Sequence, residues 1–190
     1  MQEKTLVLIK PDAVQRGLIG EIITRFEKTG LKIVAMKMVY ASKELAGQHY
    51  ADDEDWLKSV GEKTLKSYEK KGIKLNRTAL EHGRIVRQQL MDFISMSPIV
   101  ALVLEGENAV EHVRKIVGPT APSDAPPGTI RGDYSFETYQ MADVLDRPLQ
   151  NLIHASGAMH EAEREIKVWF TPQEIHVWKR VDDDLIYRKG

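Results

Sequence analysis

Ile99-Val100-Ala101-Leu102-Val103-Leu104 is the longest uninterrupted apolar run in the chain, and Pro98 stands directly before it. A short run that is apolar at odd and even positions alike is typical of a strand buried on both faces of a sheet. Its six residues are far fewer than the roughly 20 that a helix needs to cross a bilayer. The run therefore predicts the central strand of a soluble domain.

The segments before this strand alternate between strand and helix patterns. Residues 5–9 predict a buried strand that Pro11 ends, and residues 31–40, rich in Val, Ile and Met, predict a second strand. Between them, apolar side chains at positions 19, 22, 23 and 26 have helical spacing, and Gly30 suits the C-terminal cap. Ser42 is expected to cap a further helix that reaches Tyr50.

Residues 51–93 differ in character, because they open on Asp52, Asp53, Glu54 and Asp55 and mix many charges with scattered apolar residues. We interpret this segment as a helical insertion within one domain that spans residues 1–190. Gly72 and Asn76 are expected to divide it into two helices.

The chain beyond the central strand predicts two more helices and a fourth strand. Asn108, followed by Glu111, suggests a capping box for a helix that Gly118 ends. Residues 118–132 hold four prolines and three glycines, which predicts a long loop without regular structure. A short strand is expected at residues 151–154 and a helix at 158–170.

Composition excludes several classes of protein. The 190 residues contain no Cys, which excludes disulfides, thiolate zinc sites and cysteine nucleophiles. The net charge of −1 gives no global attraction to nucleic acid or to an anionic membrane. The N-terminal apolar run ends at Lys10, too early for a signal peptide, so we expect a cytoplasmic protein.

Several side chains could hold a polyphosphate, although the sequence lacks the P-loop pattern G-x-x-x-x-G-K-[ST]. Lys10, Arg114 and Arg131 could supply positive charge, and the planar fork of Arg suits phosphate oxygens. Thr120 and Asn151 could add neutral hydrogen-bond donors. Taken alone, each Lys or Arg is more often a solvated surface charge, so the interpretation depends on the whole set.

Three short segments carry a resemblance to a known family: Lys10-Pro11-Asp12, Gly128-Thr129-Ile130-Arg131-Gly132-Asp133 and Asn151-Leu152-Ile153-His154-Ala155-Ser156. Together with residues 15–22 and 34–37, they resemble the nucleoside diphosphate kinase family. The resemblance covers roughly residues 3–50 and 94–178. It implies an α/β fold with a ferredoxin-like antiparallel sheet, βαββαβ, with helices on one face.

The resemblance also implies a reaction. His154 would take the γ-phosphoryl group from a nucleoside triphosphate such as ATP and pass it to a nucleoside diphosphate in a ping-pong scheme. The family's phosphate, ribose and catalytic contacts correspond to Lys10, Tyr50, Arg114, Thr120, Arg131 and Asn151, and the pair that supports the histidine to Ser156 and Glu165. By spacing alone, Glu161 and Glu163 would be alternatives to Glu165.

The family further implies Mg²⁺ held largely by the nucleotide phosphates, and a homo-oligomer, either a tetramer or a hexamer. We expect no membrane and no dedicated nucleic-acid partner. A zinc site at His154 and His160 is not expected, since His160 points away from the apolar arc of its helix. Two other hypotheses stay open: a regulatory module that binds nucleotides or nucleic acid without turnover, and a purely structural subunit.

Three features of the sequence depart from the family. Gly157 replaces the usual acidic residue after the histidine motif, which would remove one contact from that turn. The residue that stacks on the base falls within 51–93, where Val86, Leu90 and Phe93 are candidates. Extra residues at about 134–148 are expected to alter a subunit contact or to cover the site.

Overall fold

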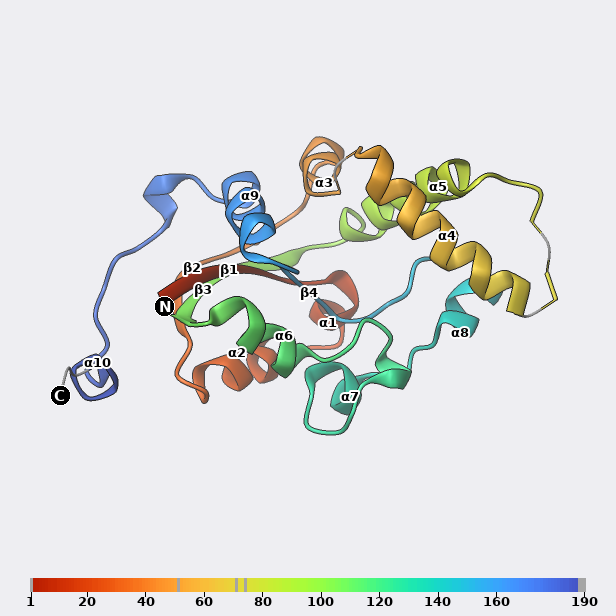
Figure 1. Ribbon diagram of the computed structural model, residues 1–190. Helices are drawn as coiled ribbons and strands as arrows, with labels where there is room; N and C mark the ends of the chain where they lie inside the picture. Colours follow the sequence, from red (N-terminus) through yellow and green to blue (C-terminus); the bar gives the residue numbers. More distant parts are fainter. Residues whose placement is uncertain (1, 51, 71, 74, 188–190) are drawn as a thin grey trace.

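Four strands form one antiparallel sheet in the order β2-β3-β1-β4 (Figure 1). The computed structural model describes residues 2–50, 52–70, 72–73 and 75–187. The strands are β1 (Gln2–Ile9), β2 (Lys32–Val39), β3 (Ile99–Glu107) and β4 (Ile153–Ala155). The apolar run quoted above lies in β3, between β1 and β2, which confirms it as a central strand.

The two helices that connect the strands of the βαββαβ core lie on one face of the sheet, as expected, and further helices cover the other face. On one face lie α2 (Ile19–Glu27) and α6 (Ala109–Val117), and on the other lie α3 (Lys43–His49) and α9 (Met159–Trp169) (Figure 1). The reason lies in β1, where Val7 and Ile9 enter one apolar core while Leu6 and Leu8 enter a second core on the opposite face. Because alternate residues of a strand point to opposite faces, an all-apolar strand needs cover on both.

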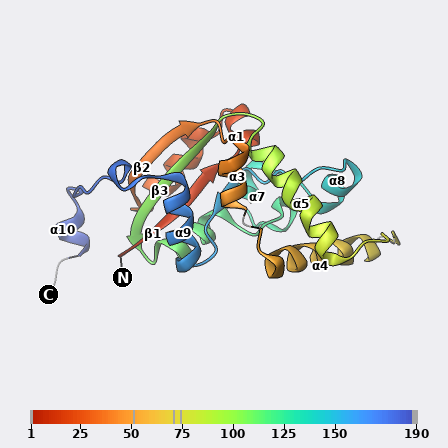
Figure 2. The same ribbon diagram turned by 90° about the horizontal axis from the view of Figure 1, so that it is seen from above.

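Two long helices, α4 (Glu54–Lys70) and α5 (Ala79–Ile94), occupy the segment expected to be a helical insertion. They pack against each other beside the sheet, and they lie at its edge when it is viewed from above (Figure 2). Gly61 and Gly83 bring the two backbones close, since a Cβ on Gly61 would lie 1.8 Å from the carbonyl oxygen of Ala79. Thr78 and Glu81 form a capping box at the start of α5.

Several short helices were not foreseen from the sequence. They are α1 (Pro11–Gln15), η1 (Pro122–Asp124), α7 (Ile130–Tyr134), α8 (Tyr139–Val144), η2 (Pro172–Glu174) and α10 (Asp183–Ile186). Elements of three to six residues contain too few positions for a periodicity to appear. The expected capping box at Asn108 is also wrong, because Asn108 adopts φ 46° and its side chain caps nothing.

The chain after η2 runs along the outer edge of β2. The backbone N–H of His176 donates to the carbonyl of Val34 at 2.8 Å, and Trp178 Nε1 donates to the carbonyl of Ile33 at 3.0 Å. Lys32 Nζ donates to the carbonyl of Trp178 at 2.9 Å. This segment, residues 175–178, therefore covers the first half of an edge strand. Among the described residues, none of the helices has the length and apolar character needed to cross a membrane.

Candidate active site

His154 lies in β4 with a carboxylate and a hydroxyl behind it. Its Nε2 is 2.9 Å from Glu165 Oε2, and Ser156 Oγ donates to the same carboxylate oxygen at 2.7 Å. Glu165 sits on the inward face of α9 and is 4% exposed, whereas 22% of the His154 side chain is exposed. Of the three acidic residues considered on this helix, Glu165 is therefore the one that contacts the histidine.

The charge of Glu165 determines which nitrogen of His154 carries the proton. Burial opposes ionisation, but the hydrogen bonds from His154 and Ser156 and the charge of Arg164 outweigh it and lower the pKa of the carboxyl. A carboxylate only accepts hydrogen bonds, so Nε2 must carry the hydrogen. The lone pair of neutral His154 is then at Nδ1, for which the described part of the chain offers no hydrogen-bond partner.

Glu161, which was considered as an alternative support for the histidine, has a different role. Its carboxylate accepts a hydrogen bond from the backbone N–H of Gly157 at 2.8 Å. A Cβ at position 157 would lie 2.6 Å from that carboxylate oxygen. The contact expected to be missing at Gly157 is therefore replaced by one from the first turn of α9.

Lys10, Asn151 and the 118–121 loop are joined by hydrogen bonds. Lys10 Nζ donates to Asn151 Oδ1 at 2.8 Å, and Asn151 Nδ2 donates to the carbonyl of Thr120 at 2.9 Å. Burial and the nearby charge of Arg131 lower the pKa of Lys10 to about 8, although Asp12 opposes the shift. The side chain of Thr120 itself remains on the exposed surface.

Arg131 is buried and hydrogen-bonded to the backbone, unlike an exposed arginine that is free to bind a phosphate. It is 8% exposed and donates to four carbonyl groups, those of Gly118, Pro119, Asn151 and Ile153. Four of its five N–H groups are thus used to hold the 118–119 loop against the turn before His154. This structural part was not foreseen from the sequence.

Arg114 differs from Arg131 in both its burial and its hydrogen bonding. Its side chain is exposed on α6, and within the described residues that side chain makes no hydrogen bond or ion pair. Its charge is near enough to contribute to the lowered pKa of Arg131, after burial. The two arginines therefore lie on one side of the site, one fixed and the other free to meet a ligand.

Tyr50 lies next to His49 at the end of α3. Burial and the charge of Glu165 raise the pKa of the Tyr50 hydroxyl. Arg87 of α5 donates to the carbonyl of Tyr50 at 2.6 Å and to that of Gly47 at 3.2 Å, so the second long helix holds this corner of the site. His49 and Arg87 were not identified from the sequence, because neither lies in a motif.

One cluster has spacing that a metal ion could use: ligand atoms of His49, His154 and Glu165 lie within 4.8 Å of one another. Two of these residues already bond to each other, and His49 Nδ1 accepts a hydrogen bond from Trp169 Nε1 at 3.3 Å. Lys10 and Arg164 add positive charge close to the cluster. These surroundings suit an anion better than a cation.

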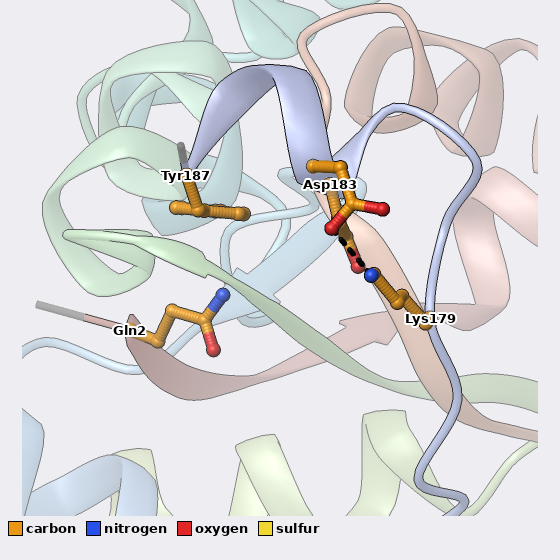
Figure 3. A pocket seen from close by; sticks show the side chains of 5 residues that line it. Gln2, Lys179, Asp183 and Tyr187 are labelled. Atoms are coloured by element: carbon orange, nitrogen blue, oxygen red, sulfur yellow. Dashed lines mark hydrogen bonds and ion pairs between the residues drawn. The ribbon is translucent and has the colours of Figure 1, made fainter. Parts of the chain in front are cut away.

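A hollow of about 530 Å³ lies elsewhere, between the start of β1 and α10. Gln2, Lys179, Asp183, Asp184 and Tyr187 line it, and Figure 3 shows the Lys179 side chain directed toward its acidic partner there. None of these residues belongs to the site around His154.

The sequence comparison decides the family. The profile described as nucleoside diphosphate kinase matches residues 3–58 and 60–175. The chain belongs to the nucleoside diphosphate kinase family. It is therefore a phosphotransferase that acts between nucleoside triphosphates and diphosphates, as the resemblance of its motifs implied.

Relatives from other organisms match the chain over nearly its whole length. A nucleoside diphosphate kinase of Pyrobaculum aerophilum is 52% identical over 178 residues, which cover 91% of this chain and 97% of the relative. The crystal structure of an NDP kinase from that organism aligns with a TM-score of 0.91 and 49% identity, covering 93% of this chain and 100% of the other.

The kinase of Borrelia burgdorferi aligns with a TM-score of 0.80 and 38% identity, covering 97% of this chain and 96% of that one. That structure is a transition-state mimic with bound vanadate and ADP. These two solved members of the nucleoside diphosphate kinase family thus share the ferredoxin-like arrangement of this sheet.

Proposed function

We propose that Nδ1 of His154 is the atom that carries the phosphoryl group between nucleotides. The observation that carries this proposal is the contact between His154 Nε2 and the ionised Glu165, because it leaves the lone pair at Nδ1. An imidazole nitrogen is a nucleophile near neutral pH without prior loss of a proton.

In the first half-reaction, the Nδ1 lone pair forms a bond to the γ-phosphorus. The bond from that phosphorus to the bridging oxygen breaks, and the leaving nucleoside diphosphate takes its electron pair. Glu165 stabilises the positive charge on the ring through the Nε2 hydrogen. In the second half-reaction, a terminal oxygen of an acceptor diphosphate attacks the same phosphorus, and the bond to Nδ1 breaks.

The cationic and amide side chains beside His154 would neutralise the phosphates. We expect Arg114 and Lys10 to contact the phosphates directly and Asn151 and Thr120 to add neutral donors. Arg131 would act mainly by holding the loop that carries Thr120. Phosphoryl transfer requires chiefly positioning and charge neutralisation, and these side chains support the proposal because they would supply both.

Mg²⁺ fits this site as an ion that arrives with the nucleotide. Two carboxylates near His154 are engaged, Glu165 by His154 and Ser156, and Glu161 by Gly157. Phosphate oxygens and water would therefore supply its ligands. When bound, it would neutralise charge on the transferred group.

Incubation with γ-labelled ATP tests the assignment, because a phosphohistidine is labile in acid and stable in base. We expect such a phosphoenzyme in the wild-type protein and in His160→Ala, whose side chain is exposed on α9. The His154→Ala variant should fold and show neither the phosphoenzyme nor turnover. Labelled His154→Ala would contradict the assignment, and nucleotide binding without any phosphoenzyme would favour a regulatory module.

We also infer that the chain works as a homo-oligomer in the cytoplasm. Large apolar side chains lie exposed on and after β2, at Met36, Met38 and Tyr40, where a second copy could cover them. Light scattering after gel filtration tests the assembly, and fractionation of cells tests the compartment.

A further inference from the structure

His49, the last residue of α3, packs its ring against that of His154. The ring centroids are 4.5 Å apart, and the planes meet at 89°. His49 is 3% exposed, and it also contacts the rings of Tyr50 and Trp169 at 4.7 and 5.7 Å. This arrangement arises because α3 and α9 lie side by side on one face of the sheet (Figures 1 and 2).

Trp169 fixes the protonation pattern of His49. The indole Nε1–H donates to His49 Nδ1 at 3.3 Å, and an indole nitrogen can only donate. The hydrogen of neutral His49 is therefore on Nε2. That atom is buried, and the described part of the chain provides no hydrogen-bond partner for it.

His49 is also held uncharged. Burial lowers its pKa well below the usual value, and His154 when it is protonated, together with the positive charges of Lys10 and Arg164, lowers it further. A protonated ring would place a second N–H against the indole N–H of Trp169. The uncharged ring of His49 therefore packs beside the ring of His154.

The hydrogen bond to Glu165 does not by itself fix His154. One bond at Nε2 leaves the imidazole able to swing about its side-chain torsions, and 22% of the side chain is open to solvent. A perpendicular ring at 4.5 Å removes the space for that movement on one side. A buried N–H without a partner is unfavourable, so its presence next to the nucleophile calls for a function.

We propose that His49 is a positioning residue for His154: its neutral ring, anchored by Trp169, confines the imidazole to the orientation in which Glu165 binds Nε2 and Nδ1 faces the nucleotide. The proposal rests on the proposed function of His154 as the phosphoryl carrier. His49 itself touches no reacting atom in this scheme.

Single-turnover phosphorylation of His49→Ala at saturating ATP tests the proposal. We expect the rate to fall about tenfold or more, because small misplacements of a reacting group are costly, while the KM for nucleotides changes less than about threefold. His49→Phe keeps a ring wall without nitrogen atoms and should recover most of the rate. His160→Ala serves as the matched loss of a histidine and should behave as the wild type.

Nitrogen-15 NMR of the histidine rings supplies a readout that does not depend on activity. In the wild-type protein, His154 should be a single tautomer with hydrogen on Nε2, and in His49→Ala its signals should shift toward a mixture. Circular dichroism verifies the fold, and His49→Leu replaces His49→Ala if the latter does not fold. His49→Leu fills the space with an apolar, non-planar group and should be slow as well.

A folded His49→Ala or His49→Leu variant that is phosphorylated at the wild-type rate would overturn the proposal. So would a slow variant in which the His154 tautomer is unchanged. Both outcomes still show a phosphoenzyme, whereas a failure of the proposed function would leave even the wild-type protein without one.

Discussion

The carboxylate of Asp12 binds the backbone N–H of Leu152, with 2.9 Å between Oδ2 and the nitrogen. Leu152 adopts φ 68°, a left-handed conformation that side chains other than Gly rarely take, and it stands two residues before His154. Asp12, at the start of the chain, therefore holds an unfavourable turn that sets the position of the nucleophile.

Removal of the Asp12 carboxylate should destabilise this turn. Asp12→Ala leaves the buried amide of Leu152 without an acceptor, and we expect a loss of about 1–3 kcal/mol in the free energy of unfolding, measured with urea. Asp12→Asn keeps an acceptor and should lose less than half as much. Equal losses in the two variants would show that the hydrogen bond does not support the turn.

The lowered pKa of Lys10, about 8, predicts a pH dependence. As the pH rises through about 8, Lys10 of the free enzyme loses its proton and hence a positive charge, so kcat/KM for ATP should fall. Lys10→Arg keeps the charge and should lack this fall. A pH profile from 6 to 10 checks both, and an unchanged fall in Lys10→Arg would assign it to another group.

The two arginines should fail in different ways. Arg131→Ala leaves four carbonyl groups without their donor, so we expect a loss of at least about 2 kcal/mol in unfolding free energy as well as slow transfer. Arg114→Ala changes an exposed side chain and should alter stability by less than about 0.5 kcal/mol while raising the KM for nucleotides. Thermal unfolding and steady-state kinetics separate the two. Equal stability losses would argue against the buried role of Arg131.

Close contact between α4 and α5 depends on two glycines. A Cβ at Gly83 would lie 2.0 Å from the carbonyl oxygen of Leu57, so Gly83→Ala should cost about 1–3 kcal/mol and loosen both helices in hydrogen exchange. Gly20→Ala in α2 is the matched control, because nothing lies within 4 Å of its Cβ, and it should stabilise slightly. Similar effects of the two substitutions would contradict the tight crossing.

Replacement of residues 53–85 by a short Gly-Ser connector should separate chemistry from base contact. The phosphate-binding side chains lie outside this segment, and Arg87, which holds Tyr50, remains. We expect His154 to be phosphorylated by ATP while the KM rises or base preference changes. A variant that is folded by circular dichroism but not phosphorylated would show that the segment helps to build the phosphate site.

The long elements were predictable because each carries a hydrophobic repeat or an apolar run, as in β3 and α2. The cover on the second face was missed because Leu6 and Leu8 read as part of one apolar run, whose two faces must each find a partner from distant segments. The contact between His49 and His154 was also missed. The two residues are far apart in the sequence, and nothing in either segment indicates that the end of α3 packs beside β4. The motifs located His154 and Lys10. They could not show that Arg131 is buried and donates to backbone carbonyls, because burial is a property of the packed fold.

The segment that follows η2 also affects the colloidal behaviour of the protein. An edge strand with open N–H and C=O groups is a template on which other chains pair and aggregate. Hydrogen bonds from His176 and Trp178 occupy the carbonyls of Val34 and Ile33 on that edge. We therefore expect protein that a protease has cleaved before residue 175 to precipitate on storage, although the cleaved protein still contains an intact His154.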